Sequence, residues 1–74
     1  MAESNVESPM TGNVIEISVE IGQTVDVGDL LIVIESMKME NEIFSEVSGT
    51  ITGILVKEEQ NVGQEEVLMT ISTE

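Results

Sequence analysis

Apolar and polar positions along the chain follow a pattern that repeats once. When the sequence is shifted by 37 residues against itself, its two halves align without a gap. The equivalent pairs are Val6 and Ile43, Gly12 and Gly49, Val14 and Ile51, Ile17 and Ile54, Val19 and Val56, Gln23 and Gln60, Val25 and Val62, Leu30 and Val67, Leu31 and Leu68, and Ile34 and Ile71. Most pairs are apolar in both halves and recur at even or nearly even spacing, which is typical of strand faces. Because neither half can bury such a face alone, the pattern predicts a sandwich of two sheets with approximate two-fold symmetry.

Each half contains the same predicted succession of strands. The first half has strands at 2–7, 13–19 and 30–35 and a short extended piece at Val25; the second has 39–44, 50–56, 67–72 and a short piece at Val62. Polar turns at 20–24 and 57–61 separate them. We therefore expect an all-β fold without helices, a flattened barrel or sandwich of two four-stranded sheets formed by one domain over residues 1–74. Gly28 suits a turn with positive φ, whereas Glu65 stands at the equivalent position, so the second turn is expected to differ.

The repeat also predicts where the ends of the chain lie. The two-fold axis exchanges strands 30–36 and 39–44 with strands 67–72 and 2–7. The first and last strands should therefore pair with each other, as the two hairpin strands do. Both chain ends should then lie together at the end of the sandwich opposite Lys38, whose counterpart in the repeat is Met1.

The connection between the two halves breaks the local rules for a tight turn. Residues 30–36 and 39–44 must form a hairpin, yet its tip contains no Gly, Asn or Asp. A two-residue hairpin turn requires positive φ at both central residues, here Met37 and Lys38, at a cost of about 1–2 kcal/mol each. Such violations are frequent at functional sites. Lys38 is one of only two lysines and stands between two methionines, which predicts a lysine presented for recognition at the tip.

Composition narrows the chemistry that this lysine could serve. Ten valines and nine isoleucines in 74 residues favour sheet, and the chain contains no cysteine, histidine or arginine for ordinary nucleophilic or acid–base catalysis. The net charge of −13 disfavours nucleic acid and anionic membranes as partners. No segment resembles a signal peptide or a membrane span, so we expect a soluble cytoplasmic protein. Lys57 stands in a polar turn beside Glu58 and Glu59, and we assign it no function.

The residues around Lys38 resemble a known modification motif. The run 35–40, Glu-Ser-Met-Lys-Met-Glu, is similar to the biotinylation motif of biotin carboxyl carrier proteins and of the biotinyl domains of biotin-dependent carboxylases, with Ser36 where Ala is more usual. Segments 8–12, 21–25 with Gly28, and 48–54 resemble other parts of the same biotinyl/lipoyl family. The resemblance covers nearly the whole chain. It is greatest to the stand-alone biotin/lipoyl attachment proteins, so the chain is expected to be either a free carrier or a domain excised from a longer one.

The resemblance implies a carrier without catalytic groups of its own. A biotin protein ligase would join biotin covalently to Lys38, with Glu35, Met37 and Met39 as ligase-recognition residues. A biotin carboxylase would then load the biotin with CO2, and a carboxyltransferase would pass it to an acyl-CoA, as in fatty acid biosynthesis, or to a keto acid. The physical contribution of the carrier would be effective concentration, since a tethered intermediate visits both enzymes without diffusing away.

Two other functions remain open at this stage. A lipoyl domain has the same fold and a hairpin lysine, and Glu35, three residues before Lys38, is compatible with lipoate. Met37 and Met39 argue against a lipoyl domain, because lipoyl domains usually have Asp before the lysine and Ala or Val after it. Lipoate, alone or beside biotin, is therefore the alternative cofactor. An acidic interaction or calcium-binding module is the alternative from another class, although Asp26 and Asp29 are too sparse for a calcium loop and no metal site is expected.

Overall fold

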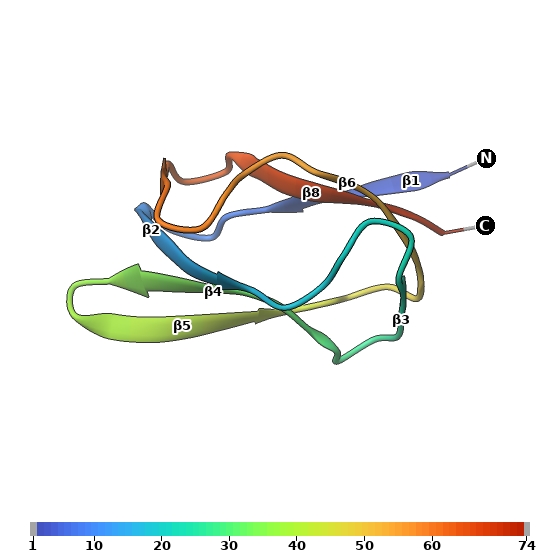
Figure 1. The fold of residues 1–74 in the computed structure, drawn as a ribbon, viewed down its shortest axis with the longest axis horizontal. Helices are drawn as coiled ribbons and strands as arrows, with labels where there is room; N and C mark the ends of the chain where they lie inside the picture. The colour runs from blue at the N-terminus through green and yellow to red at the C-terminus, as the bar shows by residue number, and fades with distance from the viewer. Residues whose placement is uncertain (1, 74) are drawn as a thin grey trace.

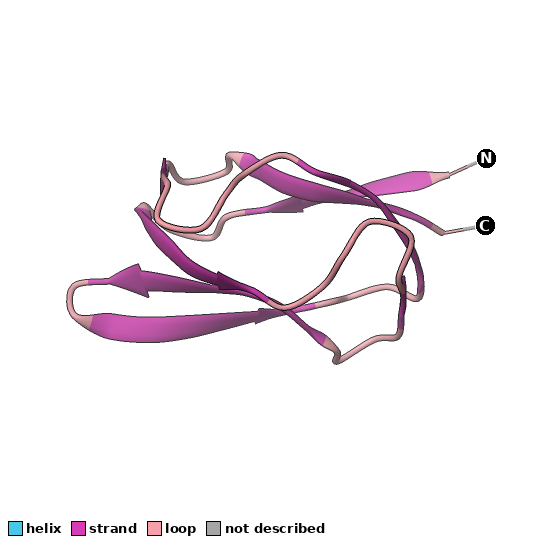
Figure 2. Ribbon diagram, viewed as in Figure 1, coloured by secondary structure: helices cyan, strands magenta, loops and turns pink. Residues whose placement is uncertain are grey.

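The strands predicted from the repeat form two antiparallel sheets. The computed structural model describes residues 2–73, and no helix occurs among them (Figures 1 and 2). The eight strands are β1 (Glu3–Glu7), β2 (Gly12–Ile17), β3 (Thr24–Val25), β4 (Leu30–Ser36), β5 (Met39–Phe44), β6 (Gly49–Ile54), β7 (Asn61–Val62) and β8 (Val67–Ser72). One sheet has the order β1-β8-β6-β3 and the other the order β5-β4-β2-β7. The predicted all-β sandwich of two four-stranded sheets is confirmed, with two strands of only two residues each.

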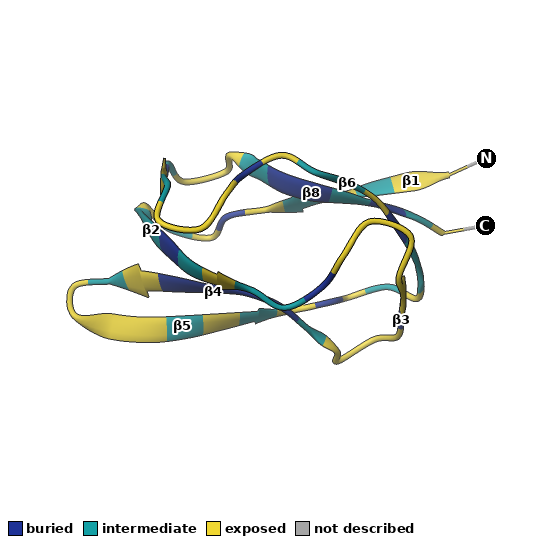
Figure 3. Cartoon of the chain, in the orientation of Figure 1, coloured by how far each residue is buried: buried dark blue, intermediate teal, exposed yellow. Residues whose placement is uncertain are grey.

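The core between the sheets follows the sequence repeat residue by residue. Its twelve buried residues are six repeat pairs: Val14 and Ile51, Val19 and Val56, Val25 and Val62, Leu31 and Leu68, Ile32 and Met69, and Ile34 and Ile71. Five of the pairs place two apolar side chains from opposite sheets into the same interior, and Val19 and Val56 add to it from beyond the strand ends. Aliphatic side chains fill this volume without aromatic rings. In Figure 3 the buried residues lie along strands of both sheets, among them β4 and β8. Val33 is also buried, although it lies outside this cluster.

The two long inner strands end earlier than the sequence pattern predicts. The predicted strands 13–19 and 50–56 end at Ile17 and Ile54, while Val19 and Val56 beyond them are still buried. The pairing of β2 with β4 shifts between Val14 and Glu16, and that of β6 with β8 shifts at the equivalent place. Such a bulge adds one residue to a strand and turns it away from its partner.

One predicted difference between the halves is wrong. Glu65 was expected to change the turn that Gly28 forms in the first half, yet both residues have positive φ, 69° and 94° respectively. The backbone N–H of Gly28 donates to the Ser45 carbonyl at 2.8 Å, and that of Glu65 donates to the Ser8 carbonyl at 2.7 Å. Tertiary hydrogen bonds therefore impose the same turn on a residue that disfavours it locally.

The predicted arrangement of the chain ends is confirmed. Strand β1 pairs with β8, and the N–H of Thr73 donates to the carbonyl of Ala2 at 2.9 Å. The two ends lie together at one end of the molecule, and the turn between β4 and β5 lies at the other (Figure 1). The long axis measures 36 Å against 18 and 17 Å across. Met1, the repeat counterpart of Lys38, lies outside the described residues. None of residues 2–73 belongs to a helix that could cross a membrane.

Candidate functional site

The connection between β4 and β5 is a two-residue turn at the end of a long hairpin. Ser36 pairs with Met39, which leaves Met37 and Lys38 as the central residues, with φ of 53° and 65°. Positive φ at both positions is the geometry of the tight hairpin turn that matches strand twist. The predicted strain is therefore present at both residues, neither of which is glycine. The ladder from Leu30–Phe44 to Ser36–Met39 holds the turn in place.

The side chains at this tip lie in solvent. Met37 is 92% exposed and Met39 67% exposed, while Lys38, Glu35 and Glu40 are also exposed. The two methionines contribute nothing to the core, so their apolar surface is left for contact with other molecules. Glu35 and Glu40 face each other across the ladder. Two carboxylates directly opposite each other repel, so the site combines strain, exposed apolar surface and like charge in one short segment.

The base of the hairpin is fixed to the rest of the molecule. Nδ2 of Asn41 donates to the carbonyl of Ile34 at 3.4 Å and to that of Met39 at 3.3 Å, and Ile34 itself is fully buried. Strand β2 approaches β4 closely at Gly12, where an added Cβ would lie 2.5 Å from the Glu35 carbonyl oxygen and 2.6 Å from Cγ2 of Ile34. The tip therefore projects from a rigid support. The sequence analysis predicted neither the hydrogen bonds of Asn41 nor the close approach of strands at Gly12. The recurrence of Gly12 as Gly49 in the repeat was a signal that could have indicated this close approach.

Lys57 occupies a different kind of position. It follows β6 in a turn where its backbone N–H donates to Oε1 of Gln60 at 3.0 Å. The first half has the same turn, with the N–H of Glu20 donating to Oε1 of Gln23 at 3.1 Å. Lys57 thus belongs to a turn that occurs in both halves, and its counterpart in the first half is Glu20. It does not lie at a hairpin tip.

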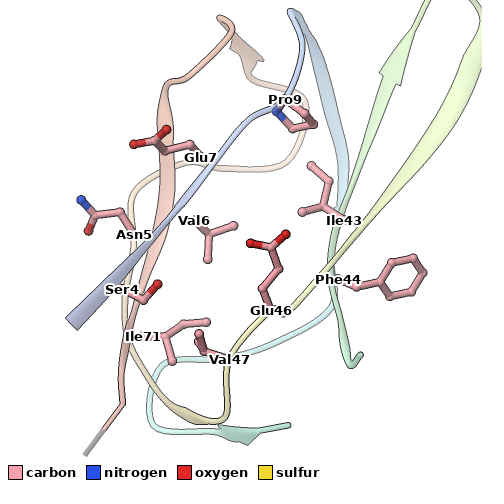
Figure 4. A pocket seen from close by; sticks show the side chains of 10 residues that line it. All are labelled: Ser4, Asn5, Val6, Glu7, Pro9, Ile43, Phe44, Glu46, Val47 and Ile71. Carbon is pink, nitrogen blue, oxygen red and sulfur yellow. The ribbon is translucent and has the colours of Figure 1, made fainter. Parts of the chain in front are cut away.

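A small cavity lies between the edge strands β1 and β5, where the two sheets meet (Figure 4). Its volume is about 190 Å³, and the repeat partners Val6 and Ile43 line it together with Val47 and Ile71. Pockets that enclose small molecules usually measure about 300–1,000 Å³. This cavity lies between the equivalent strands β1 and β5 and is smaller than the usual ligand pocket. The hairpin tip is therefore the better candidate for the functional site.

The chain is similar to proteins of a known family. A biotin/lipoyl family profile, described as "Biotin-requiring enzyme", matches residues 4–71. The chain is 45% identical over 73 residues to the biotin carboxyl carrier protein of acetyl-CoA carboxylase from Pseudomonas aeruginosa, covering 89% of this chain and 47% of that protein. It is 44% identical over 66 residues to the biotin-dependent acyl-coenzyme A carboxylase alpha3 subunit of Mycobacterium leprae, covering 89% of this chain and 11% of that protein.

A solved structure shares the fold. The single-chain, multi-domain long-chain acyl-CoA carboxylase superimposes with a TM-score of 0.91 at 25% identity, over 97% of this chain and 7% of the carboxylase. The chain thus spans about half of the carrier protein and a small part of the two larger proteins. Since the family profile covers most of the sequence, the chain belongs to the biotin/lipoyl family.

Proposed function

We propose that Nζ of Lys38 is the point at which biotin is attached, and that the domain carries the biotin between a biotin carboxylase and the carboxyltransferase of an acyl-CoA carboxylase. The observation that carries the proposal is the strained, two-residue tip that holds Lys38 in solvent between two exposed methionines. Lys57, the other lysine, lies in a turn whose counterpart in the first half has Glu20 at this position, and not at a hairpin tip.

The surroundings of Lys38 fit a covalently attached arm. The attachment requires an uncharged amine that attacks the activated carboxyl carbon of biotin, forms an amide and releases the activating group and one proton. An exposed lysine at a hairpin tip can enter the active site of a ligase without unfolding of the domain. Once attached, biotin supplies a ureido nitrogen that accepts and releases CO2. The domain itself holds and positions the arm.

The shape of the molecule supports a role in transfer between two enzymes. The tip and the chain ends lie at opposite ends of a 36 Å axis, so a tether at either end leaves Lys38 free. A tethered group reaches two active sites at a higher effective concentration than a free one. The net charge of −13 would direct the domain to basic surfaces on the ligase, the carboxylase and the transferase. The cytoplasmic location expected from the sequence stays a prediction.

Biotin is favoured over lipoate for two reasons. Met37 and Met39 flank Lys38 as in the biotinylation motif, and the relatives described above are carriers or subunits of biotin-dependent carboxylases. Recognition by the ligase through Glu35, Met37 and Met39 is part of the same proposal, because all three side chains are exposed beside the acceptor.

Mass spectrometry tests the proposal. The chain should be co-expressed with an active biotin protein ligase and free biotin, alongside Lys38→Arg and Lys57→Arg variants. The wild-type chain and Lys57→Arg should each gain one biotinyl group, and Lys38→Arg should gain none while its unfolding midpoint stays unchanged. A biotinyl group mapped to Lys57, a lipoyl group, or no modification of the folded wild-type chain would contradict it.

A further inference from the structure

The methionines of residues 2–73 divide into exposed and buried ones. Met37 is 92% exposed and Met39 67% exposed, and both lie at the hairpin tip. Met69 is fully buried in the core, and Met10 packs partly buried against it. Among the methionines of residues 2–73, the two most exposed are thus those that flank Lys38.

Exposure of this kind decides where a methionine is oxidised, because the oxidant must reach the sulfur atom. We propose that Met37 and Met39 form a reversible oxidation site, and that their conversion to methionine sulfoxide blocks biotinylation of Lys38. The second half of the proposal rests on the function proposed above for Lys38. The oxidant is a hydroperoxide, and the restoring enzyme is a methionine sulfoxide reductase.

The chemical step is a two-electron oxidation of sulfur. The thioether sulfur attacks one oxygen of the hydroperoxide, an S–O bond forms and the O–O bond breaks. The leaving oxygen takes a proton and departs as water or an alcohol. The hydroperoxide is reduced while the thioether becomes a sulfoxide. The apolar end of the side chain is thereby replaced by a strongly polar S–O group next to the acceptor lysine.

The position of the two side chains explains why the effect falls on recognition. An enzyme that reaches Nζ of Lys38 must cover the residues on either side of it, and Met37 is almost wholly available for that contact. A sulfoxide buried there without a hydrogen-bond donor weakens association by about one or two orders of magnitude. The domain should keep its stability, because neither side chain belongs to the core.

The two methionines also differ in a way that sets the order of the reaction. Met37 is more exposed than Met39 and lies in the turn itself, whereas Met39 is the first residue of β5 and pairs with Ser36. Met37 should therefore be oxidised first. Buried Met69 should react more slowly than Met37 by at least about tenfold, since it becomes accessible only when the domain opens.

The test uses the unmodified folded domain and hydrogen peroxide, with the peroxide removed before the ligase is added. Cleavage after Glu35 and Glu40 isolates a peptide with both methionines and Lys38, in which mass spectrometry follows each added oxygen. We expect oxidation of Met37 ahead of Met69, a fall in the rate of biotinylation of at least about tenfold, and recovery after sulfoxide reductase treatment. The unfolding midpoint should stay the same.

Variants separate the tip from the other sulfur atoms. In Met37→Leu/Met39→Leu the rate after peroxide should equal that variant's own untreated rate, whereas Met10→Leu should respond to peroxide like the wild type. Equal rates for oxidised and untreated wild-type domain would overturn the block on biotinylation and leave the proposed function intact. Failure of the untreated domain to accept biotin on Lys38 would overturn the proposed function and, with it, the block on biotinylation.

Discussion

Replacement of Met37 by glycine should make the domain more stable and at the same time a poorer substrate for the ligase. Met37 adopts a φ of 53°, a conformation that costs a non-glycine residue about 1–2 kcal/mol. Glycine removes this strain but also gives the unfolded chain more freedom, which offsets about 0.4–1 kcal/mol. The side chain is 92% exposed, so its removal sacrifices almost no packing.

The net gain is about 0.5–1 kcal/mol in the free energy of unfolding, by the difference of these two terms. For a domain of this size that corresponds to a rise of about 4 °C in the unfolding midpoint. The rate of biotinylation should nevertheless fall, because the thioether next to Lys38 is lost. Calorimetry or circular dichroism of the unmodified domain gives the first quantity, and a ligase assay gives kcat/KM for the second.

Another turn, present in both halves of the chain, provides matched controls for the sign of the stability change. Gly28 has a φ of 94° and an added Cβ would meet nothing within 4 Å, so Gly28→Ala introduces the same two backbone terms with opposite sign and no clash, and should destabilise by about 0.5–1 kcal/mol. Glu65→Gly, at the equivalent position, should stabilise by a similar amount. If Met37→Gly lowered the midpoint while these two variants behaved as expected, the turn would not be strained and the reasoning about the tip would be refuted.

Three further expectations follow from the structure. Met37→Asp with Met39→Ala should shift modification from biotin toward lipoate, as measured by intact mass. Thermal unfolding should show a change in stability of less than about 0.5 kcal/mol. Undiminished biotinylation would show that the methionines do not select the ligase. Gly49→Ala should lower the free energy of unfolding, measured in urea, by about 3 kcal/mol, because the added Cβ would overlap the backbone of Ser72. The control Gly63→Ala should be nearly neutral, and equal effects of the two substitutions would contradict this expectation. A large tag at either chain end should leave the rate of ligase action on Lys38 unchanged, and a strong reduction would speak against an unobstructed tip.

Much of the fold could be predicted because the alternation of apolar and polar residues indicates strands, and its repetition after 37 residues indicates the two-fold symmetry. The alternation of apolar residues identified the buried face of each strand, and the 37-residue repeat paired those faces across the core. The positive φ of Met37 and Lys38 also followed, since a tight hairpin without glycine permits little else. These features depend on local spacing and on topology, both of which are present in the sequence.

The features that could not be predicted depend on contacts between distant residues. The turn at Glu65 repeats the one at Gly28 because its backbone bonds to Ser8, a constraint that local propensity does not contain. The bond that joins Asn41 to the two strands of the hairpin is of the same kind, since it depends on a rotamer chosen after the strands have paired.

The internal symmetry explains why the molecule presents one closed tip instead of two. The pair Ser36–Met39, which closes the hairpin, has as its counterpart the pair Thr73–Ala2, where the chain ends meet. A chain joined to Ala2 or Thr73 therefore leaves at the far end of the 36 Å axis from Lys38. The proposed acceptor, Lys38, and the point where a tether would join the domain are placed at opposite ends by the same two-fold relation. A carrier that turns about its tether gains the longest reach from this placement, because the whole length of the domain then adds to that of the arm.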